Sequence, residues 1–184
     1  VLGYLPVTTQ WNYAVGANWT HYNENSFQTI VFSRNHLNNS SKKYANNIEN
    51  DEFLLQDYNS QEIENKFRFE NTFRKNGWKL NYGLGYEFCM YTNSTFQKIP
   101  FSDSSLTIDF KSNFNFHKFA YFAQASKKLF EDKFILSLGI RTDHNSYSKD
   151  MANPLRQLSP RLSIAYAFST KFSFNFNIGR YYQL

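Results

Sequence analysis

One segment of the chain carries charged groups of both signs at alternate positions, and such groups could bind an ion or take part in acid–base chemistry. The row comprises Glu62, Glu64, Lys66, Arg68 and Glu70. Side chains two residues apart share one face of a β-strand, so this spacing predicts a charged strand face. Mixed charges at this spacing most often pair with neighbouring strands inside a polar channel. We therefore expect a structural role for the row.

The other groups capable of chemistry form no recognisable constellation. Cys89 falls in the middle of a predicted strand, where a small wall residue is the simpler interpretation than a nucleophile. Gly83 and Gly85 continue a strand and open no helix, so they form no phosphate-binding loop. The histidines are too far apart for a His-x-x-His metal motif: His21, His36, His117 and His144. We expect no enzyme activity, no cofactor, and no catalytic or metal site.

The elements that position these groups are read from a hydropathy period of two, which is the period of a β-strand. From Trp78 to Met90 the even positions are aromatic or aliphatic and the odd positions are polar or small. Aromatic residues make up 20% of the chain, which favours β-structure and interfaces. No stretch approaches the roughly 18 consecutive apolar residues that a membrane-spanning helix requires.

Turn signals divide the chain into four hairpins. Asn76-Gly77 accepts the positive φ angles of a tight hairpin turn, and short polar turns at 23–25, 131–133 and 169–171 predict three more. The predicted strands are 10–20, 26–36, 61–73, 78–92, 115–129, 133–143, 160–168 and 172–182. Long polar loops are predicted between the hairpins, at 37–60, 93–114 and 144–158.

Tight turns and long loops alternate along the chain, so a meander would place all turns at one rim and all loops at the other. Outer-membrane barrels have this pattern, with periplasmic turns and extracellular loops. The sequence thus predicts an all-β, antiparallel up-and-down meander of about eight strands. We expect it to be part of a larger transmembrane β-barrel in the bacterial outer membrane.

Each predicted strand has one face toward lipid and one toward the lumen. The predicted lipid-facing and girdle residues are Trp11, Trp19, Phe67, Phe69, Trp78, Leu80, Tyr82, Leu84, Leu136, Leu138, Phe172, Phe174 and Phe176. The predicted lumen-facing residues are Glu62, Glu64, Lys66, Arg68, Glu70, Glu87, Arg141, Asp143 and Arg161. Asn65 and Asn71 fall on the lipid side and are predicted to lie at the rims. The segment 119–122 is apolar on both faces, so its lumen side is expected to pack against another part of the protein.

The net charge of +5 does not indicate nucleic-acid binding, because Lys and Arg are scattered and no basic run of five occurs. The partners we expect are the lipid bilayer and lipopolysaccharide, with no nucleic acid.

Three motifs follow one another near the end of the chain. Gly139-Ile140-Arg141-Thr142-Asp143 precedes a long loop, Ser159-Pro160-Arg161 opens the returning strand, and Gly179-Arg180-Tyr181-Tyr182 follows. In order and spacing these motifs resemble the barrel region of TonB-dependent outer-membrane receptors. The abundance of Asn, Lys, Phe and Tyr is similar to that of sequences from the Bacteroidetes.

The resemblance implies a barrel of about 22 strands whose lumen is plugged by an N-terminal domain. Such a receptor imports a scarce ligand, an iron chelate, cobalamin or a glycan, with energy from the inner-membrane TonB complex. A plug domain and barrel-closing strands are not found in the chain, so we expect an interior fragment. Its expected partners are its own plug domain, the remaining barrel strands, the TonB complex and the imported ligand.

Two alternatives stay open at this point. A self-contained eight-stranded outer-membrane barrel with a structural or adhesive role would need its last strand to pair with its first. A soluble aromatic-rich β-protein that binds carbohydrate or lipid would need rows such as Phe172, Phe174 and Phe176 to form its core.

Overall fold

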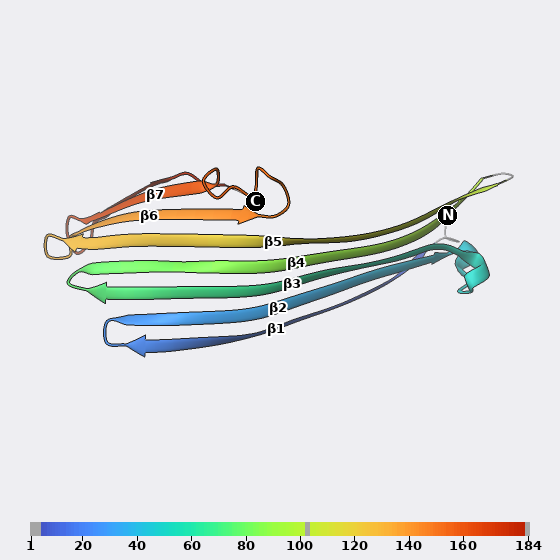
Figure 1. Ribbon diagram of the computed structural model, residues 1–184, viewed down its shortest axis with the longest axis horizontal. Helices are drawn as coiled ribbons and strands as arrows, with labels where there is room; N and C mark the ends of the chain where they lie inside the picture. The colour runs from blue at the N-terminus through green and yellow to red at the C-terminus, as the bar shows by residue number, and fades with distance from the viewer. Residues whose placement is uncertain (1–4, 102–103, 183–184) are drawn as a thin grey trace. The chain divides into compact units, whose positions relative to one another are not determined.

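The computed structural model describes residues 5–101 and 104–182. They form one eight-stranded sheet in which each strand pairs with the next along the chain (Figure 1). The strands are β1 Pro6–Asn23, β2 Ser26–Tyr44, β3 Leu54–Lys75, β4 Trp78–Pro100, β5 Ser105–Leu129, β6 Phe134–Asn145, β7 Leu158–Ala167 and β8 Ser173–Gly179. Two short 3-10 turns, η2 Ala45–Asn47 and η3 Asp51–Phe53, connect β2 to β3. The predicted all-β antiparallel meander is confirmed. Among the described helices, none is long and apolar enough to cross a membrane.

The chain divides into two compact units, each described here by itself. The first unit comprises residues up to 15, 34–65 and 89–115, and the second comprises 16–33, 66–88 and the residues from 116 onward. Strands β1 to β5 contribute residues to both units.

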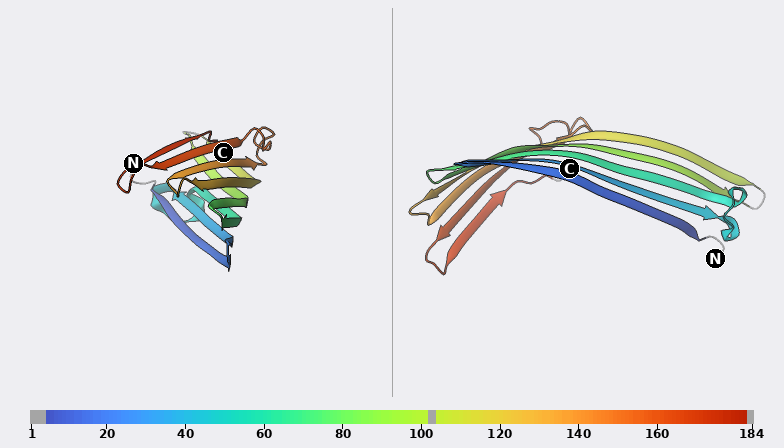
Figure 2. Two further views of the ribbon diagram at one scale, coloured as in Figure 1. Left: turned by 90° about the vertical axis from the view of Figure 1, so that its left-hand side faces the viewer. Right: turned by 90° about the horizontal axis from the view of Figure 1, so that it is seen from below.

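In the second unit the tight turns connecting consecutive strands lie at one end (Figure 2). The predicted turn between β3 and β4 is confirmed, because Asn76 and Gly77 have φ angles of 51° and 74°. Between β5 and β6, three successive residues have positive φ: Phe130, Glu131 and Asp132. Since β6 starts at a tight turn, the connection 146–157 that follows it leaves from the opposite end of this unit.

In the first unit the strands are longer than predicted, so the predicted loops 37–60 and 93–114 are wrong in extent. Strand β2 continues to Tyr44 and β3 begins at Leu54, while only 101–104 separate β4 from β5. Polar cross-strand pairs hold this region, such as Lys42 with Asp57 at 3.7 Å. The added ends of β2, β3 and β4 are mostly polar, so their period-two signal is weak although the backbone pairs there. The start of β5 does alternate, with Leu106, Ile108 and Phe110 between polar residues, and the predicted loop 93–114 overlooked this signal. At the other end of the chain, the predicted last strand 172–182 is too long, because β8 ends at Gly179.

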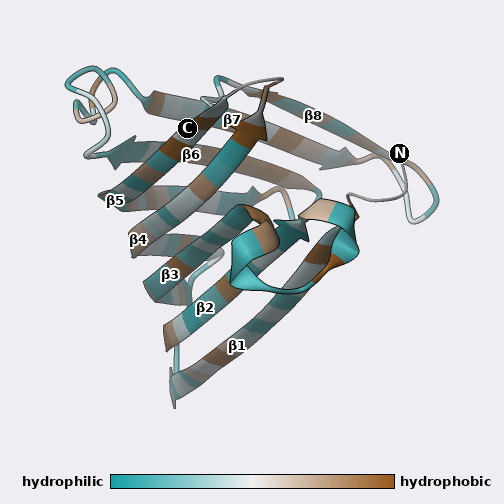
Figure 3. Ribbon diagram, turned by 90° about the vertical axis from the view of Figure 1, so that its right-hand side faces the viewer, coloured by the Kyte–Doolittle hydropathy of each residue, from teal (hydrophilic) through white to brown (hydrophobic). Residues whose placement is uncertain are grey.

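Hydropathy alternates along the strands (Figure 3), and the register of β5 to β8 sorts the side chains into two rows. On one face Leu138 lies opposite Ala125 and Leu162, and Leu162 lies opposite Ile178. On the other face Arg141 lies opposite Phe122 and Ser159. Directly opposed residues share a face, so we name these the apolar face and the polar face.

The sheet has no apolar core among the described residues, where the one buried apolar side chain is Cys89. Large apolar side chains are exposed instead, including Trp78 at 46%, Leu138 at 57% and Phe174 at 52%. A soluble domain buries such side chains between packed layers, which argues against the soluble alternative. The sheet runs from β1 to β8 without closing, whereas a self-contained eight-stranded barrel must close on itself.

Candidate functional site

The polar face of the second unit is hollowed, with a cavity of about 610 Å³ lined by residues from β3 to β7 and by the segment after β8. Its charged residues are Lys66, Arg68, Glu70, Glu87, Lys118, Arg141, Asp143 and Arg161. Seven of the nine residues predicted for the lumen meet here. The other two, Glu62 and Glu64, belong to the first unit.

Sequence reasoning missed Lys118 as a member of this site. Its carboxylate partner is Glu87, whose Oε1 lies 2.9 Å from the Lys118 ammonium. The second oxygen of Glu87 lies 3.7 Å from Lys66, so one carboxylate links β3, β4 and β5. The segment 119–122 is apolar at every position, so the alternation of polar and apolar residues is not visible there on β5. Lys118, Ala120 and Phe122 are two residues apart and therefore share one strand face, and this spacing could have identified Lys118 as a member of the site.

Two cations of the site are paired within their own strands. The Arg141 guanidinium donates through Nε and Nη2 to the two carboxylate oxygens of Asp143, both at 2.6 Å. Arg68 lies 3.4 Å from Glu70 in the same i, i+2 arrangement. These pairs support the interpretation of the charged row as structural pairing, since fork-shaped contacts of this kind fix side-chain orientation.

Arg161 differs from these cations, because no carboxylate of the described chain lies within ion-pair distance of it. Its guanidinium carbon lies 4.8 Å above the ring of Tyr181, as in a cation–π contact. Counted together, the charged side chains that line the cavity are five cations and three carboxylates. A concave surface with excess cations attracts anionic groups.

One apolar side chain, Phe122, also lies on the polar face, where it faces Arg141. Its ring packs over Gly83: a Cβ built at Gly83 would lie 2.7 Å from the ring and 2.4 Å from the carbonyl oxygen of Phe69. The expected packing partner of segment 119–122 is therefore this glycine, and the ring covers the space that a side chain would otherwise fill.

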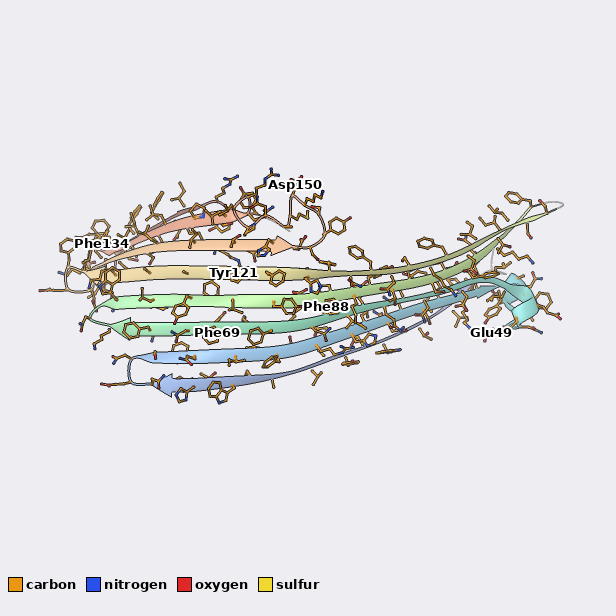
Figure 4. The ribbon with its side chains drawn as sticks, in the orientation of Figure 1. Glu49, Phe69, Phe88, Tyr121, Phe134 and Asp150 are labelled. Carbon is orange, nitrogen blue, oxygen red and sulfur yellow. The ribbon has the colours of Figure 1, made fainter. Side chains whose placement is uncertain are left out.

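The apolar face of the second unit carries ring clusters at two levels. Near the tight turns, the Lys127 ammonium lies 5.0 Å from the ring of Trp78. About ten residues further along the strands, Phe88 stacks on His117 at 4.9 Å and Phe119 stacks on His144 at 5.2 Å; Figure 4 labels Phe88 on β4. Ten residues span about 33 Å of strand, or about 23 Å along the membrane normal at 45° tilt. An outer-membrane barrel has an apolar band about 25 Å tall between two aromatic girdles.

Two asparagines among the predicted lipid-facing positions each make a side-chain hydrogen bond, although the Oδ1 of Asn71 is buried without a partner among the described residues. Asn71 is only 7% exposed and donates to the Tyr82 hydroxyl at 2.8 Å. In the first unit, Asn65 accepts a hydrogen bond from Arg34 at 2.7 Å. His36 stacks edge-on against Trp11 at 4.7 Å, and His21 stacks on Trp19 at 5.6 Å. The histidines are therefore packed among aromatic rings, and the thiol of Cys89 is buried and forms no disulfide within the described residues.

A single sheet with one apolar face bounded by aromatic rings, one charged face and no apolar core in its described residues defines the wall of a membrane β-barrel. The model of the TonB-dependent receptor-like β-barrel family matches residues 3–184, and the chain belongs to this family. A search of curated proteins gave no match. Members of this family are receptors and transporters rather than enzymes, and they are located in the bacterial outer membrane.

Proposed function

We propose that the chain supplies wall strands and outer loops to a receptor that actively imports a scarce ligand of the iron chelate, cobalamin or glycan type. In this proposal the apolar face contacts lipid and lipopolysaccharide, and the polar face lines the lumen. The plug domain and further strands complete the barrel, and the TonB complex supplies the energy. The observation that carries the proposal is the charged hollow on the polar face, with its five cations and three carboxylates.

The excess of cations favours a ligand with negative charge, because clefts lined by one sign of charge raise the local concentration of the opposite sign. Among the three ligand classes, an anionic ferric chelate fits this best. The unpaired Arg161 and the ring of Tyr181 offer a planar donor group and an aromatic surface to such a ligand.

Uptake in whole cells tests the function. A strain lacking the receptor and the same strain carrying it are given radiolabelled ferric chelate, cobalamin or oligosaccharide, each with and without a protonophore. We expect the receptor to raise accumulation of one class, with the ferric chelate first, and the protonophore to remove the gain. Equal accumulation in both strains for all three classes would refute the import function.

Cysteine labelling tests the proposed orientation, with tight turns in the periplasm and the connection 146–157 outside. Lys149 and Thr170 are exposed at opposite ends of the second unit, and the native Cys89 is buried. We expect an impermeant maleimide to label Lys149→Cys on intact cells and Thr170→Cys only after lysis. The reverse result would invert the orientation.

A further inference from the structure

One cation of the first unit, Arg34 of β2, lies on the strand face that carries Tyr13 of β1 and Asn65 of β3, and it is held in place there without a carboxylate. Its Nε donates to the Tyr13 hydroxyl on β1 at 2.9 Å, and its Nη1 donates to the Asn65 side chain on β3 at 2.7 Å. No carboxylate in residues 5–101 or 104–115 lies within ion-pair distance of the guanidinium. A guanidinium has five N–H groups, so two are engaged and the rest are available to an acceptor outside the chain.

The surroundings of Arg34 are aromatic. His36 packs against Trp11 at 4.7 Å and against Tyr13 at 5.4 Å, and the Trp11 side chain is 47% exposed. Arg34 is the ninth residue of β2, counted from the tight turn. Along β2 it lies away from that turn, and rings such as those of Trp11 and Tyr13 form the girdle at an edge of the apolar band.

An uncompensated cation on a lipid-facing surface is unfavourable, and its cost falls toward the membrane interface, where an anionic headgroup can neutralise it. A guanidinium matches phosphate geometry and binds it through two parallel hydrogen bonds. Basic groups among aromatic side chains at the interface are suited to lipid headgroups. We propose that Arg34, with Trp11, Tyr13 and His36 around it, binds the phosphate of an outer-leaflet lipid of the lipopolysaccharide class.

This inference rests on the proposed orientation, which the cysteine labelling tests independently. Binding is measured on the full receptor in detergent micelles, by native mass spectrometry during titration with lipid A. We expect Arg34→Gln to weaken lipid A binding about tenfold or more, because charge-assisted hydrogen bonds are lost. Dephosphorylated lipid A should bind the unaltered receptor equally weakly. Inorganic phosphate should not replace the lipid, since it lacks the acyl chains that contact the apolar face.

Lys127→Gln is the matched control, because Lys127 is a cation on the apolar face of the second unit, at the tight-turn end and over Trp78. It should leave lipid A binding unchanged, and the heat-modifiable band on unboiled gels should show that both variants are folded. Equal binding by Arg34→Gln and the unaltered receptor would overturn the site. If Arg34→Gln loses binding while the labelling shows inverted topology, Arg34 binds phosphate but does not face the outer leaflet, and the assignment to a lipid of the lipopolysaccharide class fails.

Discussion

Replacing Leu138 by arginine is expected to remove most of the receptor from the outer membrane. Leu138 is 57% exposed on the apolar face, between Ala125 and Leu162 of the neighbouring strands. It is the fifth residue of β6, so it lies four steps from the tight turn, or about 9 Å along the membrane normal at 45° tilt. This depth is close to the middle of the apolar band. An arginine facing lipid at the midplane costs about 2–4 kcal/mol, which lowers the ratio of folded to unfolded protein roughly 30- to 1000-fold.

The matched control is Ser137→Arg, one residue earlier on the same strand. Ser137 lies on the polar face, opposite Ser126 and Ser163, where the new cation would face other polar groups. We expect this variant to reach the membrane in near-normal amount. The measurement is the quantity of heat-modifiable receptor in isolated outer membranes. Equal loss in both variants, or no loss in either, would show that the proposed assignment of faces to lipid and lumen is wrong.

The fold was largely predictable from the sequence where a strand has one apolar and one polar face. Trp78 to Met90 shows this alternation without interruption, and the Asn-Gly pair before it specifies the turn. There a shift of register by one residue would exchange the two faces, so hydropathy alone fixes both the strand and its register. The first-unit ends of β2, β3 and β4 were not predictable in this way, because most of their residues are polar, whereas the start of β5 carries the alternation at Leu106, Ile108 and Phe110.

The candidate site was predictable in composition but not in its pairing. The charged row on β3 and the motif on β6 named five of its members, and Glu87 on β4 and Arg161 on β7 were also predicted. Which carboxylate meets which cation depends on the offset between strands, and the bridge from Lys66 through Glu87 to Lys118 crosses three of them. Only the two pairs within single strands, such as Arg141 with Asp143, follow from local spacing.

Gly83→Ala is expected to impair assembly because the backbones and the Phe122 ring leave no room for a side chain. A Cβ at this position would lie 2.4 Å from the Phe69 carbonyl oxygen and 2.7 Å from the Phe122 ring. Overpacking of this kind typically costs about 1–3 kcal/mol. We expect the heat-modifiable receptor in outer membranes to fall several-fold and the denaturant midpoint of the remaining protein to decrease.

Gly85→Ala is the control, because Gly85 lies on the same face of β4 but has space for a side chain. The nearest atom to a Cβ there is the Ala120 Cβ at 3.5 Å, an ordinary contact. This variant should assemble like the unaltered receptor. Adding Phe122→Ala to Gly83→Ala should restore only part of the loss, since the Phe69 carbonyl remains in place. Full recovery would assign the obstruction to the ring alone, and normal assembly of Gly83→Ala itself would refute the close approach of β3, β4 and β5 at this glycine.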